Sequence, residues 1–163
     1  YRLGHRDVLF AAAYRGDDFT RMFTAAWRRL TGDDGNCRVL PTMRGADSGD
    51  RVLDAWMERR ESVVYAYDDV MAAGILSAAH WRGIPVPEAL SLLGTDDYPI
   101  CDLLWPKLST INQDHTEQGR AGACLLLSHL RDPDMTCRVT LVEPRLAERE
   151  TFRIGNTGLP RLV

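Results

Sequence analysis

Residues 63–97, VVYAYDDVMAAGILSAAHWRGIPVPEALSLLGTDD, decide the fold of this chain. Two apolar runs in this stretch, Val63–Tyr67 and Leu90–Gly94, each lead to a pair of aspartates, at 68–69 and at 96–97. Continuous apolar runs of about four to eight residues are typical of strands buried on both faces of a parallel sheet. The alanine-rich segment between the runs predicts a helix. The stretch therefore predicts a strand–helix–strand unit.

Capping chemistry sets the ends of the alanine-rich helix. Asp68 or Asp69 is expected to accept hydrogen bonds from the backbone N–H groups of its first turn. Gly83 and Pro85 predict that the helix stops at about Arg82. An aspartate at such a junction is explained by capping as readily as by ligand binding, so both interpretations stay open here.

The same pattern of strand and helix extends over most of the chain. The helix from Phe19 to Leu30 has apolar residues at intervals of three and four, and Thr116 is a candidate cap for a later helix. The expected strands are 8–13, 37–42, 62–67, 90–94, 108–112 and 139–142, and the expected helices are 19–30, 50–59, 69–82 and 116–130. This alternation predicts an α/β fold with a mostly parallel sheet. The tail, 152–163, is expected to be loosely ordered.

Composition narrows the class of protein. The 163 residues are enough for one domain with a core, and the formal net charge of −3 gives no general case for nucleic-acid binding. No apolar run approaches the roughly 18 to 20 residues that span a bilayer, so no membrane partner is expected. The first residues are polar and carry no secretory signal, and the sequence reads as a piece of a longer product. A cytoplasmic location is expected.

The chemistry-bearing motifs are few. The four cysteines are far apart, which indicates neither a zinc site nor a disulfide framework, and reduced thiols are expected. The sequence contains no nucleophile elbow, phosphate-binding glycine loop, dinucleotide fingerprint or metalloprotease motif. An enzyme is therefore disfavoured, and no metal or cofactor is implied.

Polar residues gather where the predicted strands end. Ligands of open parallel sheets bind outside the carboxyl ends of the strands. The residues expected at this edge are Arg15, Asp17, Arg44, Asp68, Asp69, Asp96, Asp97 and Gln113. Carboxylates accept hydrogen bonds from hydroxyl and ring N–H groups, and arginine donates in a fixed fork. The edge suits a small polyhydroxylated or heterocyclic ligand, although helix caps and solvated surface arginines explain the same residues individually.

An ordered series of motifs resembles the C-terminal core of LacI/GalR-type transcriptional repressors. The segment DDVMAAGILSAAHWRGIPVPEALSLLGTDD resembles the family's Asp, Met-Ala-x-Gly, alanine-rich helix, Gly-x-x-Val-Pro and Gly-Phe/Tyr-Asp-Asp. LGHRDVLF resembles its Leu-Gly-His-Arg strand, and LWPKLSTINQD its Pro-x-Leu-Thr-Thr-x-x-Gln. GRAGACLLL and LVEPRLAERETF match the later helix and the closing Pro-x-Leu-x-x-Arg-x-Ser. The resemblance spans about residues 3 to 152.

The resemblance implies a periplasmic-binding-protein-like (type I) effector domain, mainly its C-terminal lobe. Residues 1–151 would form this effector-binding and dimerisation region, including the helix after Thr116 that returns to the other lobe. The family's helix-turn-helix headpiece, through which a homodimer binds operator DNA, is absent from this sequence. A small polar effector, a sugar or sugar derivative, would bind between the lobes and change operator affinity without catalysis.

The resemblance also assigns candidate effector contacts. Arg21 matches an effector-binding arginine at the start of the first helix, Asp69 the aspartate before Met-Ala, and Gln113 a glutamine of the cleft. The full expected set is Arg15, Asp17, Arg21, Arg44, Asp69, Asp97, Gln113 and His115. Arg44 and His115 stand where the family often has aromatic rings that stack on ligand. These departures weaken the case for a plain neutral sugar, and Arg44 hints at an acidic or phosphorylated effector.

Two other functions remain open on the sequence. A periplasmic or secreted solute-binding protein would share the fold, and an upstream signal peptide would distinguish it; the ending RLAER favours the regulator. An α/β enzyme using the aspartates as general acid or base is the second, and turnover would reveal it. The sequence also predicts that the apolar face of helix 116–130, with Ala121, Cys124 and Leu125, is exposed and drives self-association.

Overall fold

A six-stranded mixed sheet organises the chain. The computed structural model describes residues 1, 3–13, 16–42, 48–136 and 139–153. The strands are β1 Asp7–Ala12, β2 Asn36–Pro41, β3 Val63–Ala66, β4 Ser91–Thr95, β5 Thr110–Asn112 and β6 Arg145–Ala147. Their order is β2-β1-β3-β4-β5-β6, and β6 alone pairs in the antiparallel sense among these. The predicted α/β fold with a mostly parallel sheet is confirmed.

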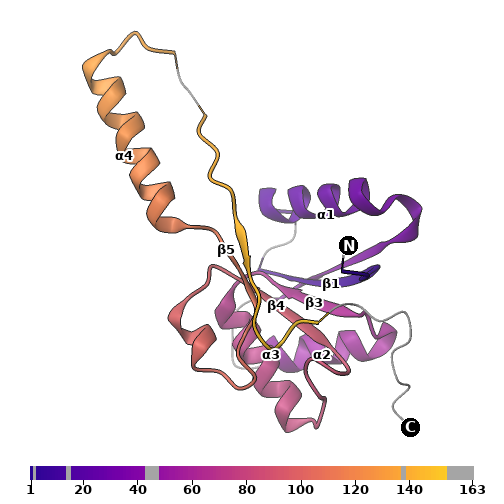
Figure 1. Ribbon diagram of the computed structural model, residues 1–163. Helices are drawn as coiled ribbons and strands as arrows, with labels where there is room; N and C mark the ends of the chain where they lie inside the picture. The colour runs from indigo at the N-terminus through magenta and orange to yellow at the C-terminus, as the bar shows by residue number, and fades with distance from the viewer. Residues whose placement is uncertain (2, 14–15, 43–47, 137–138, 154–163) are drawn as a thin grey trace.

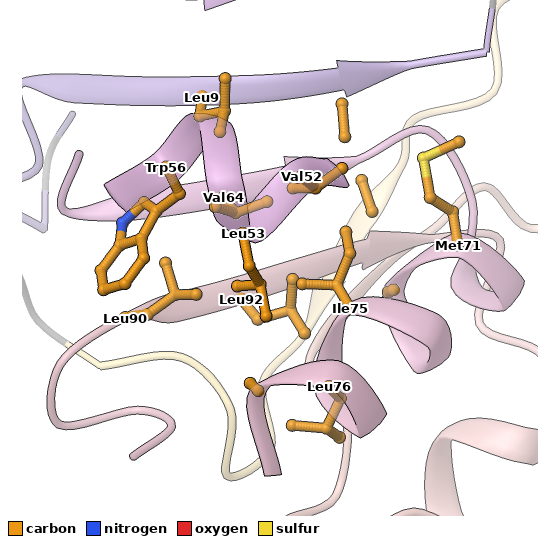
Figure 2. Packing of buried hydrophobic residues seen from close by; sticks show 14 of the residues in the cluster. Leu9, Val52, Leu53, Trp56, Val64, Met71, Ile75, Leu76, Leu90 and Leu92 are labelled. Carbon is orange, nitrogen blue, oxygen red and sulfur yellow. The ribbon is translucent and has the colours of Figure 1, made fainter. Parts of the chain in front are cut away.

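The main core lies between the sheet and two helices, α2 (Ser48–Arg59) and α3 (Asp69–Trp81). Both helices lie on the same side of the sheet (Figure 1). Trp56 of α2 and Ile75 of α3 are fully buried against the leucines of β1 and β4 (Figure 2). Gly49 lets the two helices approach, because a Cβ there would overlap the backbone carbonyl of Gly74. This packing holds β3 and β4 in place, and the two aspartate pairs follow shortly after these strands.

Helix α1 (Asp18–Thr31) covers the opposite face of the sheet. An aromatic cluster joins it to the strands: the ring of Phe23 lies 4.9 Å from that of Phe10 and 4.8 Å from that of Tyr65. Helix α1 does not cover the whole of this sheet face. A largely apolar cavity of about 310 Å³ extends from Trp27 past Leu93 to Phe152. The cavity therefore lies over the sheet face rather than at its carboxyl edge.

Helix α4 (His115–Arg131) projects away from the sheet (Figure 1). None of its residues is buried. The chain returns beside the helix, and residues 140–142 face Ala121 and Leu125 across a groove. It then re-enters the sheet as β6, where Asn112 pairs with Arg145. The excursion thus leaves and rejoins the sheet at neighbouring strands.

Two expected boundaries were wrong. Residues 139–142 form no strand, because they have no neighbouring strand to pair with; the strand begins at Arg145, beside β5. The cap of α4 is Asp114 instead of Thr116: its carboxylate accepts from the backbone N–H of Glu117. The alanine-rich helix is capped by Asp68, one of the two expected residues. Most of the expected loose tail, from residue 154 on, lies outside the described residues, and its first two residues, Phe152 and Arg153, are partly buried.

Two short 3-10 helices complete the described elements. One, η1 (Gly32–Asp34), follows α1, and the other, η2 (Pro99–Asp102), follows the second aspartate pair. Cys101 of η2 is fully buried against the main core. The loop after β4 is therefore anchored to the fold.

Candidate functional site

The carboxyl edge of the sheet gathers the polar residues that the sequence singled out. Parallel pairing brings the ends of β1, β3, β4 and β5 to one edge. The backbone N–H of Tyr67 donates to Ala11, and that of Asp96 donates to Ile111, so the ladder continues to the last residue before each loop. The side chains after these strands therefore stand in one row along the edge.

Asp69 lies beneath this edge and is fully buried. One carboxylate oxygen accepts from the Thr110 hydroxyl at 2.5 Å, and the other accepts from the backbone N–H of Tyr98 at 2.8 Å. Gly94 has to be a glycine, since a Cβ there would overlap Asp69 Oδ1. The carboxylate thus joins α3 to β5 and to the loop after β4. The geometry gives Asp69 a structural role; its predicted contact with an effector stays a prediction.

Asp96 is the point where two of the predicted site residues meet. Gln113 Nε2 donates to its Oδ1 at 2.9 Å, and His115 Nε2 lies 3.5 Å from the same oxygen. Partial burial of the Asp96 carboxylate raises its pKa, and the nearby negative charge of Asp69 raises that pKa further. The cluster therefore presents carboxylate, amide and imidazole groups together, which can both accept and donate hydrogen bonds to a polar ligand.

Asp97 is held by the fold on both sides. Its Oδ1 accepts from Arg149 Nη2 and its Oδ2 from Asn112 Nδ2, each at 2.8 Å. Asp96 and Asp97 have positive φ angles of 106° and 61°, a conformation that aspartate tolerates better than most residues. Side-chain hydrogen bonds hold the turn in this conformation. Asp97 therefore orders the edge, which is the structural reading of its role.

The start of α1 brings two further candidates to the neighbouring end of the sheet. Asp17 caps the helix by accepting from the backbone N–H of Thr20 at 2.7 Å, and the hydrogen bonds from Thr20 lower the pKa of its carboxyl group. Arg21 is exposed; it donates to the carbonyl of Gly16 and pairs with Asp18. Arg15 and Arg44, also predicted, lie outside the described residues.

The structure adds site residues that sequence reasoning missed. Asp96 was seen as one of a pair, but the contacts with Gln113 and His115 make it the centre of the cluster. Arg149 was read only as the arginine of RLAER, and no spacing rule connects it with Asp97 across 52 residues. Tyr67 was counted as the last residue of a strand, although its position at the edge follows from that strand's length.

Neither a metal-binding cluster nor a membrane-spanning helix is found in the described part of the chain. Among the residues that the structure describes, no cluster of three histidine, cysteine, aspartate or glutamate side chains is arranged to hold a metal ion. In the same described part of the chain, no helix has both the length and the apolar character needed to cross a bilayer.

An open parallel sheet with hydrogen-bonding side chains along its carboxyl edge defines an α/β domain of the ligand-binding type. Residues 1–152 match the family described as "Periplasmic binding protein-like domain". The chain belongs to this family and is an effector-binding region of the LacI/GalR type, as the sequence motifs predicted.

Curated relatives are transcriptional repressors. The HTH-type transcriptional repressor PurR of Vibrio atlanticus is 30% identical over 109 residues, covering 67% of this chain and 32% of the repressor. The ribose operon repressor of Haemophilus influenzae is 33% identical over 93 residues, covering 57% of this chain and 28% of the repressor. The matches thus span about a third of each relative's length.

A solved structure extends the likeness to almost the whole chain. The LacI family transcriptional regulator from Arthrobacter sp. FB24, in complex with lactose, superimposes with a TM-score of 0.76 at 25% sequence identity. The superposition covers 91% of this chain and 57% of the Arthrobacter regulator. The regulator therefore contains a large part with no counterpart here.

Proposed function

We propose that this chain is the ligand-sensing and dimerising region of a transcriptional regulator. It binds a small polar effector, a sugar or sugar derivative, at the carboxyl edge of the sheet, and it carries out no catalysis. The whole protein is a homodimer that binds operator DNA through a headpiece not contained in this sequence. Curated relatives that are repressors, rather than extracytoplasmic binding proteins, favour a regulator over a solute-binding protein.

The observation that carries the proposal is the cluster at Asp96. Gln113 and His115 converge on its carboxylate at the ends of β4 and β5, beside the strand junction where ligands of open sheets bind. Gln113 keeps its carbonyl oxygen for a ligand, because its amide nitrogen is the atom that donates to Asp96. A polyhydroxylated effector finds both donors and acceptors there.

A second lobe completes the proposed site. This chain offers one open edge, and helix α4 extends from that edge with no buried residue. The part of the Arthrobacter regulator that this chain lacks is large enough for such a lobe, with 57% of that regulator covered. We therefore assign α4 to the interface with the facing lobe, and the Asp96 cluster to the cleft between the two.

A thermal-shift panel on the full-length gene product tests the proposal. Neutral sugars, sugar phosphates, sugar acids and purines are the probes. A ligand present at about 100 times its dissociation constant stabilises a protein by about 2.7 kcal/mol. The shift is expected to shrink in Asp96→Asn, which keeps the shape of the side chain but removes its charge.

The matched control is Asp33→Asn in η1, far from this edge, which is expected to leave the shift unchanged. A folded wild-type protein that responds to no probe class would contradict the proposed function. An equal shift in both aspartate variants would instead move the site away from Asp96. Turnover of a bound probe would contradict the assignment of a purely sensing role.

A further inference from the structure

Tyr67 occupies the middle of the carboxyl edge. It follows directly after β3, the strand that lies between β1 and β4. Its backbone N–H donates to the carbonyl of Ala11 at 2.9 Å, which holds the residue on the ladder. The β3–β4 register pairs Tyr65 with Leu93, and its continuation places Tyr67 opposite Thr95, one residue before Asp96. The tyrosine therefore stands beside the Asp96 cluster.

Strand alternation directs the Tyr67 ring toward α1. Successive side chains of a strand point to opposite faces, so Tyr67 shares the face of Tyr65. The ring meets Phe19 of α1 edge to face, with 5.4 Å between the centroids and 75° between the planes. Phe19 lies between Asp17 and Arg21 in the first turn of α1. The ring thus joins the two groups of polar side chains along the edge.

The contact with Phe19 orients the ring without burying it. Tyr67 is only partly buried, whereas Tyr65, two residues earlier on the same face, is 6% exposed. The hydroxyl of Tyr65 accepts from Thr95, while no hydrogen bond is seen for the hydroxyl of Tyr67 among the described residues. Tyr65 is thus a core residue, whereas Tyr67 packs against the core with only part of its side chain and keeps the rest exposed.

A sugar ring matches this surface chemically. The face of an aromatic ring is negative, and the C–H bonds on one side of a cyclic sugar form an apolar face with positive character. The hydroxyl groups around the sugar rim point outward and need acceptors and donors. The Asp96 cluster beside Tyr67 supplies a carboxylate and an amide carbonyl for them. Ligand sites commonly combine aromatic walls with a few such polar groups.

We propose that Tyr67 is the stacking residue of the effector site and that it selects a cyclic sugar over an open-chain polyol. The inference rests on the proposed function and names the ligand class of that same site. One apolar face of the sugar ring lies on the Tyr67 ring, and the hydroxyls at one end of the sugar reach Asp96 and Gln113. An open-chain polyol has the same hydroxyls but presents no flat apolar face.

Titration calorimetry on the full-length gene product tests this inference, with lactose, D-ribose and the open-chain polyol mannitol as probes. At least one cyclic sugar is expected to bind more tightly than mannitol. Tyr67→Phe is expected to retain the affinity of the wild type for that sugar within about threefold. Tyr67→Leu keeps apolar contact with Phe19 but has no aromatic face, and it is expected to weaken binding about five- to tenfold.

Trp81→Ala is the control, because it removes an aromatic side chain that is 84% exposed at the far end of α3. It is expected to bind like the wild type. Wild-type affinity in Tyr67→Leu, together with lost binding in Asp96→Asn, would overturn the role of Tyr67 and leave the proposed function standing. Equal binding of mannitol and the cyclic sugars would do the same. A wild-type protein that binds neither lactose nor D-ribose would overturn the role of Tyr67, and the wider thermal-shift panel would then decide the proposed function separately.

Discussion

Arg149 and Asp97 form an ion pair in which Arg149 Nη2 lies 2.8 Å from Asp97 Oδ1, and both side chains are less than one-fifth exposed. Arg149 also donates to Asp102 and to the carbonyl of Leu108. A single side chain thus fastens the segment after β6 to the turn after β4, to η2 and to the approach to β5. The pair holds in place the turn that carries Asp96.

Replacing Arg149 by methionine is therefore expected to destabilise the fold. The change leaves Asp97 without its cation in a mostly dehydrated place, which costs about 2–4 kcal/mol of unfolding free energy. Urea denaturation measures this loss of unfolding free energy. Arg120→Met is the control, since its pair with Glu117 on α4 is exposed to solvent and its loss is expected to change the unfolding free energy far less. Equal losses in the two variants would contradict a special role for Arg149.

Asp69→Ala is expected to lower stability before it affects any ligand. The substitution removes the acceptor of one buried donor, the Thr110 hydroxyl, and of one partly buried donor, the Tyr98 N–H, and the expected cost is about 3 kcal/mol. The exposed Asp18 provides the control, with Asp18→Ala expected to change the unfolding free energy by about 0.5 kcal/mol or less. Urea midpoints without ligand separate this structural effect from binding. A near-neutral Asp69→Ala would restore the carboxylate as a candidate effector contact.

The raised pKa of Asp96 predicts a pH-dependent difference between the wild type and Asp96→Asn. In the unfolded chain the carboxyl group ionises at its usual pKa, whereas in the folded protein burial and the charge of Asp69 favour the protonated form. Its destabilising effect is thus absent below the unfolded pKa and grows as the pH rises through the folded pKa.

Relative to the wild type, Asp96→Asn is therefore expected to gain stability as the pH rises above 3.8, the usual pKa of the aspartate carboxyl group, toward neutrality. Urea titrations of both proteins at intervals of pH measure the difference. Asp33→Asn is again the control, and its difference from the wild type should not follow the same course. A gain at low pH that disappears toward neutrality would show that the sign is wrong.

The exposed leucines of α4 predict that this chain, studied alone, associates with itself. Leu126, Leu127 and Leu130 are 53–68% exposed along the helix. Exposed apolar patches of this kind favour contacts between chains. Sedimentation velocity is expected to show a weight-average mass that rises with concentration. Leu126→Glu with Leu130→Glu should reduce the rise, whereas Leu103→Glu, 83% exposed near η2, should not. A constant monomer mass at high concentration would rule the association out.

Much of the fold follows from local sequence patterns. The apolar runs before Asp68 and Asp96 predicted buried parallel strands, because such strands show no alternation. The sequence offered Asp68 and Asp69 as candidate caps of α3, and in the structure Asp68 is the cap. The strand at 145–147 was missed, since three residues of mixed polarity give no periodic signal; their pairing with β5 is a tertiary effect.

The site was less predictable than the fold. The ends of the predicted strands placed Gln113 and the aspartate pairs at one edge, and the family resemblance added His115, but neither showed which carboxylate is central to the site. Burial distinguishes the carboxylates: Asp69 is fully buried, whereas Asp96 is partly exposed and contacts Gln113 and His115. The Arg149–Asp97 pair joins residues far apart in the chain, and only the folded sheet brings them together.

The pairing of Asn112 with Arg145 has a consequence for how the chain is divided. Since β5 and β6 are antiparallel neighbours, the segment between them, residues 113–144, leaves the sheet and returns to it at the same place. A tight two-residue turn is able to connect such strands. The sheet with its three flanking helices is therefore a module whose connectivity is complete without the intervening segment, so that segment is free to vary in length and content while the strand order stays the same.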